Sequence, residues 1–227
     1  FRVYSVLRQL GLDVDIISSR ADVTGYALVV LPAHLREDVA LAQRLAQGTA
    51  QIVFGPRSGS KNHTLNFPEQ LPPGAFAALA GVQVQRAASL PPGVQDSMQW
   101  EQGADTTLTR WREDLLCVGA TPVARFSDGK PAVTHYRRAW YAAGWLDESG
   151  WRHLLVQAAQ AAGLESTALA PDLRTRRCGD LLIAMNFSSS TVAFAPSTSA
   201  QCLLGARLLA PQAVSIWKLS ASVSSVS

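Results

Sequence analysis

Residues 51–59 read Gln-Ile-Val-Phe-Gly-Pro-Arg-Ser-Gly. Three of the first four residues are apolar, and the run predicts a short buried strand. The next five residues have a glycine at each end. Glycine accepts backbone angles and close approaches that other residues do not, so Gly55 and Gly59 predict a tight turn directly after the strand. We call residues 55–59 the elbow turn.

The spacing of the elbow turn is the frame of a nucleophile elbow. In that motif, α/β hydrolases and class I glutamine amidotransferases hold a Ser or Cys above a sheet. Position 57 of this chain is arginine. Arginine keeps its proton in proteins, so Arg57 is expected to be neither a nucleophile nor a general base. Its guanidinium instead offers a rigid fork of donors to a carboxylate, a carbonyl or a sugar hydroxyl.

The segment before the elbow turn alternates between helical and strand patterns. A first helix is expected to end at Leu10-Gly11, and Val14–Ile17 is expected to form a short strand. The run Ala27–Leu31 is apolar throughout, as in a strand that is covered on both faces. The next segment predicts a helix, because apolar residues recur at helical spacing on one face: Leu35, Val39, Ala42 and Ala46. This alternation predicts a parallel sheet covered by helices, an α/β fold.

Residues 56–165 predict loops, hairpins and one long helix. Loop residues fill 56–73, Ala75–Ala80 predicts a short helix, and residues 86–113 show no clear pattern. The expected strands are Val82–Gln85, Leu115–Val118, Val123–Phe126, Ala132–Tyr136 and Ala139–Ala142. Asp147 is expected to cap a helix that carries Trp151 and Leu154 on its apolar side and ends at Gly163.

The pattern changes near Ser166, where helical spacing stops. Short strand candidates separated by turn residues predict a small antiparallel β unit: Arg174–Arg177, Leu181–Phe187, Thr191–Ala195, Gln201–Leu204 and Val214–Leu219. The expected domains are therefore residues 1–165 (α/β) and 166–219 (β), with a polar tail, 220–227, that is expected to fray.

Composition excludes several classes of protein. The 227 residues are 48% hydrophobic and 16% charged, which is typical of an ordered globular chain. A formal charge of +3 without a basic stripe argues against nucleic-acid binding. No apolar run reaches the roughly 20 residues that a membrane span needs, so no membrane partner is expected. Because the chain starts at Phe1 within a helical pattern, we expect it to be a piece of a longer protein.

The acidic, histidine and cysteine residues give no catalytic, cofactor or metal site. The acid pairs Glu37-Asp38, Glu113-Asp114 and Asp147-Glu148 are adjacent in sequence and so point in different directions; of these, Glu113-Asp114, close to Trp111, is the strongest catalytic candidate. The four histidines, His34, His63, His135 and His153, lack metal-ligand spacing. Cys117, Cys178 and Cys202 are widely spaced, and a Cys178–Cys202 bridge stays open.

Five of the six tryptophans lie between residues 100 and 151. Tryptophan faces bind sugars but also fill cores and interfaces. Packing is expected for Trp140 and Trp151. Trp100 and Trp111 could serve a carbohydrate-binding module together with the C-terminal β unit, so that function stays open.

Six stretches of the chain, taken in their order, resemble one family. They are residues 4–15 (YSVLRQLGLDVD), 26–33 (YALVVLPA), 54–61 (FGPRSGSK), 71–74 (LPPG), 128–134 (DGKPAVT) and 181–187 (LLIAMNF). Over residues 1–218 the chain resembles the β-galactosidases of glycoside hydrolase family 42, in the part that lies after the catalytic barrel.

The resemblance implies an amidotransferase-like (flavodoxin-like) three-layer α/β domain that drives trimer formation, with a small β-sandwich after it. The (β/α)₈ barrel and its two catalytic glutamates lie outside this sequence, so no catalytic residue carries over. The expected partners are two further copies in a homotrimer and the parent's own barrel. The galactoside substrate would be bound only through the parent, for which a cytoplasmic location is expected.

The elbow turn matches an Arg-Ser/Thr-Gly-x-Lys loop of the resembled family. We expect this loop to contact a neighbouring subunit near the mouth of its barrel, with Arg57, Ser58, Lys61 and His63 as candidate residues. The family usually has an acid after the lysine, where this chain has Asn62. The alternatives are an amidotransferase or hydrolase domain, which needs Cys or Ser at position 57, and the carbohydrate-binding module.

Overall fold

The computed structural model describes residues 1–103, 105–196 and 199–220. The chain forms two compact units by its internal contacts. One contains Ile17–Leu164, and the other combines Phe1–Ile16 with Glu165–Ser227. The expected fraying of the tail concerns residues 220–227, and all but Ser220 of these lie outside the described residues.

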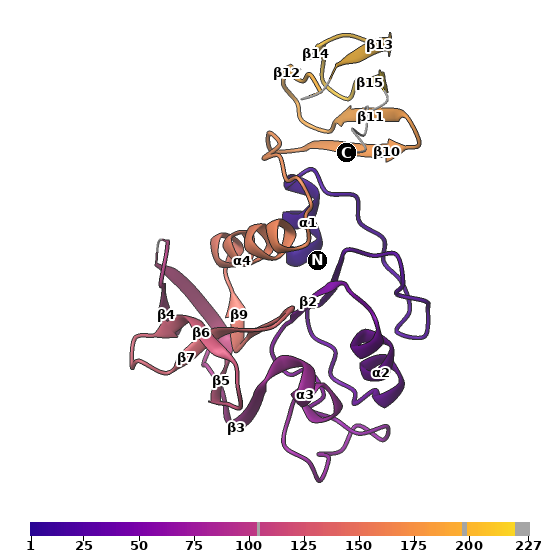
Figure 1. Ribbon diagram of the computed structural model, residues 1–227. Helices are drawn as coiled ribbons and strands as arrows, with labels where there is room; N and C mark the ends of the chain where they lie inside the picture. The colour runs from indigo at the N-terminus through magenta and orange to yellow at the C-terminus, as the bar shows by residue number, and fades with distance from the viewer. Residues whose placement is uncertain (104, 197–198, 221–227) are drawn as a thin grey trace. The chain divides into compact units, whose positions relative to one another are not determined.

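The larger unit is built on a nine-stranded mixed sheet (Figure 1). Its strands are β1 (Leu28–Leu31), β2 (Gln51–Phe54), β3 (Val82–Ser89), β4 (Gln95–Trp100), β5 (Thr106–Cys117), β6 (Thr121–Phe126), β7 (Pro131–Tyr136), β8 (Ala139–Ala142) and β9 (Gly144–Leu146). The order along the sheet is β1-β2-β8-β7-β6-β4-β5-β3, and β9 pairs with β5.

Among the described strands of this sheet, three pair in parallel. β1 pairs with β2 and β2 with β8 in parallel, whereas every other pair of this sheet in the described residues is antiparallel. The parallel part confirms the α/β alternation expected for the first 55 residues. The antiparallel part results from the short turns between β6, β7 and β8, because only antiparallel strands can be joined by hairpins.

Helices of the larger unit cover the parallel strands. They are α2 (Val39–Gln47), the 3₁₀ turn η1 (Gly74–Phe76), α3 (Ala77–Ala80) and α4 (Glu148–Ala161). Leu41 and Leu45 of α2 pack with Phe76 against Ile52 and Phe54 in one buried cluster. Val53, between those two strand residues, is fully buried and points to the opposite face. α4 contacts β2 and buries Trp151, Leu154 and Leu155 outside that cluster.

The predicted cap of α4 is confirmed, and α2 begins in the same way. The Asp147 carboxylate accepts the Gly150 N–H at 2.8 Å and begins α4, and Asp38 accepts the Leu41 N–H at 2.8 Å at the start of α2. These carboxylates satisfy amide groups that the first helical turn leaves without partners. The first helix ends as expected, because Gly11 takes a positive φ of 73° after α1 (Arg2–Gln9).

The described part of the smaller unit contains α1 and six strands. They are β10 (Leu173–Cys178), β11 (Leu181–Asn186), β12 (Val192–Ala193), β13 (Ala200–Leu204), β14 (Leu208–Leu209) and β15 (Val214–Leu219). Four of them form an antiparallel sheet in the order β10-β11-β15-β13, and β12 pairs with β14. The Asn186 side-chain amide donates to the carbonyls of Ser190, Leu209 and Ala210 at 2.8–3.0 Å and ties these turns together.

Residues 14–17 form no strand, so that prediction is wrong. Side chains in and next to this segment bind strand β10: Asp13 accepts the Arg177 N–H at 3.2 Å, and Asp15 pairs with Arg176 at 3.3 Å. The buried Arg8 guanidinium donates to the carbonyls of Leu12 and Thr175. These bonds explain why residues 1–16 group with the C-terminal strands. The division into domains at residues 1–165, 166–219 and 220–227 stays a prediction.

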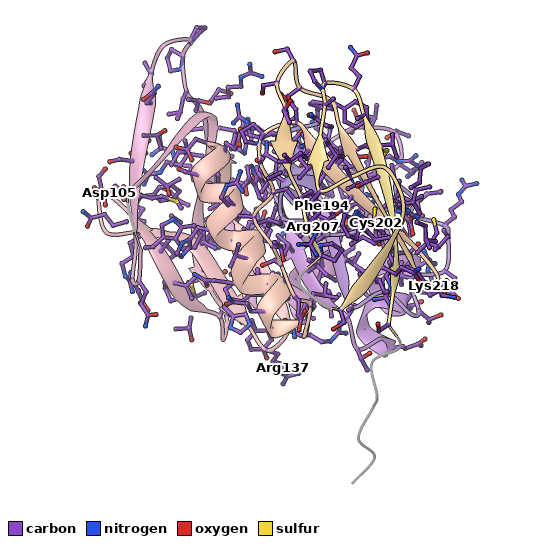
Figure 2. The ribbon with its side chains drawn as sticks, turned by 90° about the horizontal axis from the view of Figure 1, so that it is seen from above. Asp105, Arg137, Phe194, Cys202, Arg207 and Lys218 are labelled. Carbon is purple, nitrogen blue, oxygen red and sulfur yellow. The ribbon has the colours of Figure 1, made fainter. Side chains whose placement is uncertain are left out.

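Cys178 and Cys202 are both free and exposed. They lie on β10 and β13, the two edges of the four-stranded sheet, with two strands between them. Strands are about 4.8 Å apart, so roughly 14 Å of sheet separates these edges. A disulfide needs Cα atoms within about 7 Å, so this fold does not bridge the two cysteines. Figure 2 labels Cys202 on its strand.

Candidate functional site

The elbow turn lies directly after β2, at the carboxyl end of the parallel strands. The Gly55 N–H donates to the Leu31 carbonyl at 2.9 Å and extends the β1–β2 ladder. The Gly59 N–H donates to the His34 carbonyl at 2.8 Å and closes the turn. Arg57 sits between them with φ of 66°, in the left-handed region that non-glycine residues rarely adopt.

Both glycines of the elbow turn are required by close backbone contacts. A Cβ on Gly55 would lie 1.9 Å from the Pro32 carbonyl oxygen. Gly59 has φ of 61°, and its Cβ would lie 2.2 Å from the Pro73 carbonyl oxygen. The glycine frame singled out in the sequence therefore has a packing reason.

The turn departs from a nucleophile elbow in the backbone after it. Residues 56–59 are turn, Ser60 is irregular, and Lys61 forms an isolated parallel bridge with Arg36, so no helix begins there. A nucleophile elbow connects a strand to a helix. Ser58 is fully buried and its hydroxyl donates to the Gly55 carbonyl at 2.8 Å. Ser58 therefore shapes the loop from inside and is not on its surface.

A buried carboxylate, Glu113 of β5, lies against the elbow turn. Its Oε1 accepts the Arg57 backbone N–H and the Trp111 indole N–H, both at 2.9 Å. Its Oε2 accepts the Tyr141 hydroxyl at 2.8 Å. Glu113 is 1% exposed, so these three donors replace the water that the carboxylate loses. We call Glu113, Arg57, Trp111 and Tyr141 the Glu113 cluster.

Burial dominates the electrostatics of the Glu113 cluster. Desolvation raises the pKa of Glu113, while the hydrogen bonds from Trp111, Tyr141 and the Arg57 N–H and the charge of Arg57 act in the opposite direction. The pKa of Tyr141 lies well above its usual value, first because the hydroxyl is buried and then because the Glu113 charge is close.

The Arg57 side chain stacks on Trp111. Its guanidinium carbon lies 4.7 Å from the centre of the indole ring, a cation–π contact. Trp100 is 6% exposed and donates its indole N–H to the Thr106 hydroxyl at 2.9 Å. Arginine therefore lies over one face of Trp111, and Trp100 is buried.

The loop after the elbow turn is ordered by Asn62. Its Oδ1 accepts the Thr64 N–H at 3.0 Å, the Thr64 hydroxyl at 2.8 Å and the Asn66 N–H at 3.0 Å. The Lys61 ammonium lies 3.7 Å above the Phe67 ring, and Phe67 is 83% exposed. His63 is exposed within the same loop. The Asn62 side-chain oxygen thus fixes the start of this loop.

The structure separates the acids and histidines that the sequence could not place. Glu113 points into the cluster, whereas Asp114 pairs with Lys130 at 2.6 Å. His34 packs edge-on against Phe76, and burial lowers its pKa despite the nearby Asp38. Within the described ranges, no group of three or more His, Cys, Asp and Glu side chains is placed to hold a metal ion. Nor does any described helix have the length and hydropathy to cross a membrane.

Sequence reasoning found part of this site. It singled out Arg57 and the Glu113–Trp111 region separately, and the structure brings them together across 56 positions. It missed Tyr141, which lay in an apolar run expected to be an ordinary core strand. The available signal was a tyrosine at a buried strand position, since a buried phenol needs a hydrogen-bond partner.

Comparisons with known proteins match this chain to one family. The model of the β-galactosidase trimerisation domain matches residues 2–165. A β-galactosidase of Thermus thermophilus is 38% identical over 217 residues, and BgaH of Haloferax lucentense is 29% identical over 221. These alignments cover 95% and 89% of this chain but only 33% and 32% of the relatives, so the chain spans about a third of their length.

Solved structures agree with the fold. The β-galactosidase of the psychrophilic Marinomonas ef1 superposes with a TM-score of 0.91 at 32% identity, over 96% of this chain and 33% of that one. The β-galactosidase of Bacillus circulans has a TM-score of 0.87 at 19% identity over 96% of this chain and 37% of its own, which shows a shared fold.

Proposed function

Because this chain belongs to the β-galactosidase trimerisation domain family of glycoside hydrolase family 42, we propose that it assembles a longer protein into a homotrimer. The observation that carries the proposal is the family match over residues 2–165. The parent would hydrolyse terminal β-D-galactosides in a barrel outside this chain. This chain would supply assembly and no catalytic residue.

The elbow turn and the loop after it are the proposed contact with a neighbouring subunit, near the mouth of that subunit's barrel. Arg57, Lys61 and His63 would form the contact, and the buried Ser58 would support it from within. The ordered loop favours this role, since a surface that is already fixed loses less entropy on binding. Phe67, exposed next to Lys61, adds apolar area of the kind that interfaces bury.

We also propose the finer fold that the family resemblance implies. The larger unit would be a flavodoxin-like, amidotransferase-like three-layer domain, supported by parallel β1, β2 and β8 with α2 on one face. The smaller unit would be a β-sandwich formed by the four-stranded sheet and the β12–β14 pair. For the parent, the predicted cytoplasmic location can be checked by fractionating cells that express it.

Two other functions receive less support. An amidotransferase or hydrolase needs a nucleophile at position 57 and a helix after the elbow turn, and this chain has arginine and irregular backbone there. A carbohydrate-binding module needs an open aromatic face, whereas Trp100 is buried and Arg57 lies over one face of Trp111. Titration of the purified chain with galactosides would reveal saturable binding if the chain were such a module.

The proposed assembly is tested in the parent protein, expressed from the whole reading frame that contains this chain. Sedimentation equilibrium should give the mass of three chains, and Arg57→Ala and Lys61→Ala should weaken the trimer. Lys130→Ala is the matched control, because Lys130 is exposed and its ammonium pairs with Asp114 of its own chain. A parent that sediments as one chain at all concentrations would refute the assembly proposal.

A further inference from the structure

The Arg57 guanidinium has no polar partner in the described part of the chain. The other arginines that are at least partly buried each donate to a carbonyl or a carboxylate: Arg8, Arg44, Arg112, Arg138, Arg152, Arg174 and Arg176. The Nε–H of Arg57 is buried and unsatisfied. The two terminal NH₂ groups of Arg57 are not buried and have no acceptor among the described residues, so they are the donors that an acceptor from outside the chain can reach.

The guanidinium is nevertheless fixed in place. Glu113 holds the Arg57 backbone by its N–H, and the same Oε1 holds the Trp111 indole on which the guanidinium stacks. One carboxylate oxygen thus sets both the position where the side chain begins and the plane on which it lies. A planar fork that is already oriented loses little entropy when it forms a two-bond contact.

Glu113 is not itself the missing acceptor. Its two oxygens are occupied by the Arg57 N–H, the Trp111 indole and the Tyr141 hydroxyl. No carboxylate oxygen of the described residues lies within 4.0 Å of an Arg57 guanidinium nitrogen. Glu113 therefore balances the Arg57 charge through space and leaves the donors of the guanidinium free.

We propose that the Arg57 guanidinium forms a bidentate ion pair with a carboxylate side chain of a neighbouring copy of the protein, and that Glu113 is its positioning residue. The inference rests on the proposed assembly and specifies its chemistry. A carboxylate matches the fork with two parallel hydrogen bonds, which a single carbonyl or hydroxyl does not. A lysine at this position would keep the charge and lose the fork.

A copy of the protein is the partner that the observations favour. The family is defined by trimerisation, and the loop after the elbow turn exposes Leu65 at 60% and Phe67 at 83%. Apolar side chains around a charged pair exclude water and strengthen it. With a formal charge of only +3 and no cluster of basic residues beside Arg57, a nucleic acid is a poor alternative.

The test uses Arg57→Lys in the parent protein. Its new amine can be coupled by a carbodiimide, which joins an amine to a carboxylate only when the two are in ion-pair contact. Mixing ¹⁴N- and ¹⁵N-labelled chains before coupling marks each cross-linked peptide as formed within or between chains. We expect a cross-link between chains from position 57 to a single Asp or Glu, and a dissociation constant of the trimer about tenfold higher than that of the wild type.

Arg137→Lys is the matched control. Arg137 also has a positive φ, of 55°, and stacks on an aromatic ring, that of Tyr136 at 5.0 Å. It is exposed and projects from the unit, as Figure 2 shows, so its variant should not change the dissociation constant. A trimeric Arg57→Lys protein that cross-links only within one chain, or not at all, would overturn the ion pair and leave the assembly intact.

Discussion

The Glu113 carboxylate joins residues of two strands and of the turn after a third. It connects the turn after β2, the indole of Trp111 on β5 and the phenol of Tyr141 on β8. A buried ionised acid is costly unless its oxygens are hydrogen-bonded, and this one accepts three donors. The bond from the Arg57 N–H also holds Arg57 in the left-handed region, which non-glycine residues rarely adopt.

The pH dependence of stability should reveal Glu113. Its folded pKa lies above the ordinary value of 4.5, so the folded state holds the proton more tightly than the unfolded state. The contribution of Glu113 to stability is therefore full below pH 4.5 and is lost as pH rises through the folded pKa. Glu113→Gln keeps acceptors for two donors and cannot ionise.

We expect the wild-type free energy of unfolding to fall relative to that of Glu113→Gln as pH rises above 4.5. Urea unfolding monitored by tryptophan fluorescence at several pH values measures this difference. A constant difference, or one that changes in the other direction, would show that Glu113 is not desolvated as the structure has it.

Gly55 should tolerate no side chain. Its Cβ would lie 1.9 Å from the Pro32 carbonyl oxygen, a backbone atom that cannot turn away. Gly55→Ala should cost about 2 kcal/mol or more in urea unfolding, as overpacking does. Gly48→Ala is the control, since its nearest atom is 3.6 Å away and its φ is −81°. Equal stability of the two variants would contradict the packing argument.

At the scale of the element, Arg138 joins a hairpin to a helix end. Its guanidinium donates to the Ala50 carbonyl at 2.7 Å and to the carbonyl of Leu45, in the last turn of α2. A helix leaves its last carbonyls without partners, and a cation there also complements the helix dipole. Arg138 thus fixes α2 against the start of β8.

Removal of this contact should destabilise the larger unit. Arg138→Met keeps much of the apolar stem and loses the donors, so we expect a cost of about 2 kcal/mol in the free energy of unfolding. Arg137→Met, one residue earlier and exposed, should change it by about 0.5 kcal/mol or less. If Arg138→Met unfolds at the same urea concentration as the wild type, the carbonyl contacts contribute nothing.

The elements that the sequence predicted well are those with strong local signals. β1, β2, α4 and the β7–β8 hairpin were expected within a residue or two, because apolar runs, turn residues and an Asp cap depend on near neighbours. The region 86–113 was not predictable. β4 and the first part of β5 lie there, and β5 carries a register shift between Thr109 and Arg112, where Arg110 has φ of 69°. This irregularity interrupts the alternation that identifies a strand.

At the scale of the whole molecule, three histidines of the larger unit respond to pH together. Burial lowers the pKa of His34, His135 and His153 below the ordinary value of 6.5. A lowered histidine pKa means that the unfolded chain takes up protons that the folded chain does not. Stability from these groups is present above pH 6.5 and is lost as pH falls through the lowered pKa values.

We expect the melting temperature to fall between pH 7.5 and pH 5.5, a window that includes the ordinary value of 6.5, and to fall less in a variant with glutamine at all three positions. Differential scanning calorimetry measures both profiles, and above pH 7.5 the two proteins should differ by a constant amount. Parallel profiles down to pH 5.5 would show that these histidines are not buried in solution.

The sequence by itself determined the strand–turn frame at residues 51–59, the absence of a nucleophile at position 57 and the family, which the comparisons confirm. Only the tertiary structure decided that Glu113 lies against Arg57, that β2 pairs with β8, and that Cys178 and Cys202 lie on opposite edges of a sheet. The reason is separation along the sequence. Turns and amphipathic patterns depend on neighbours within a few residues, whereas the partner of a buried charge depends on contacts between residues far apart in sequence.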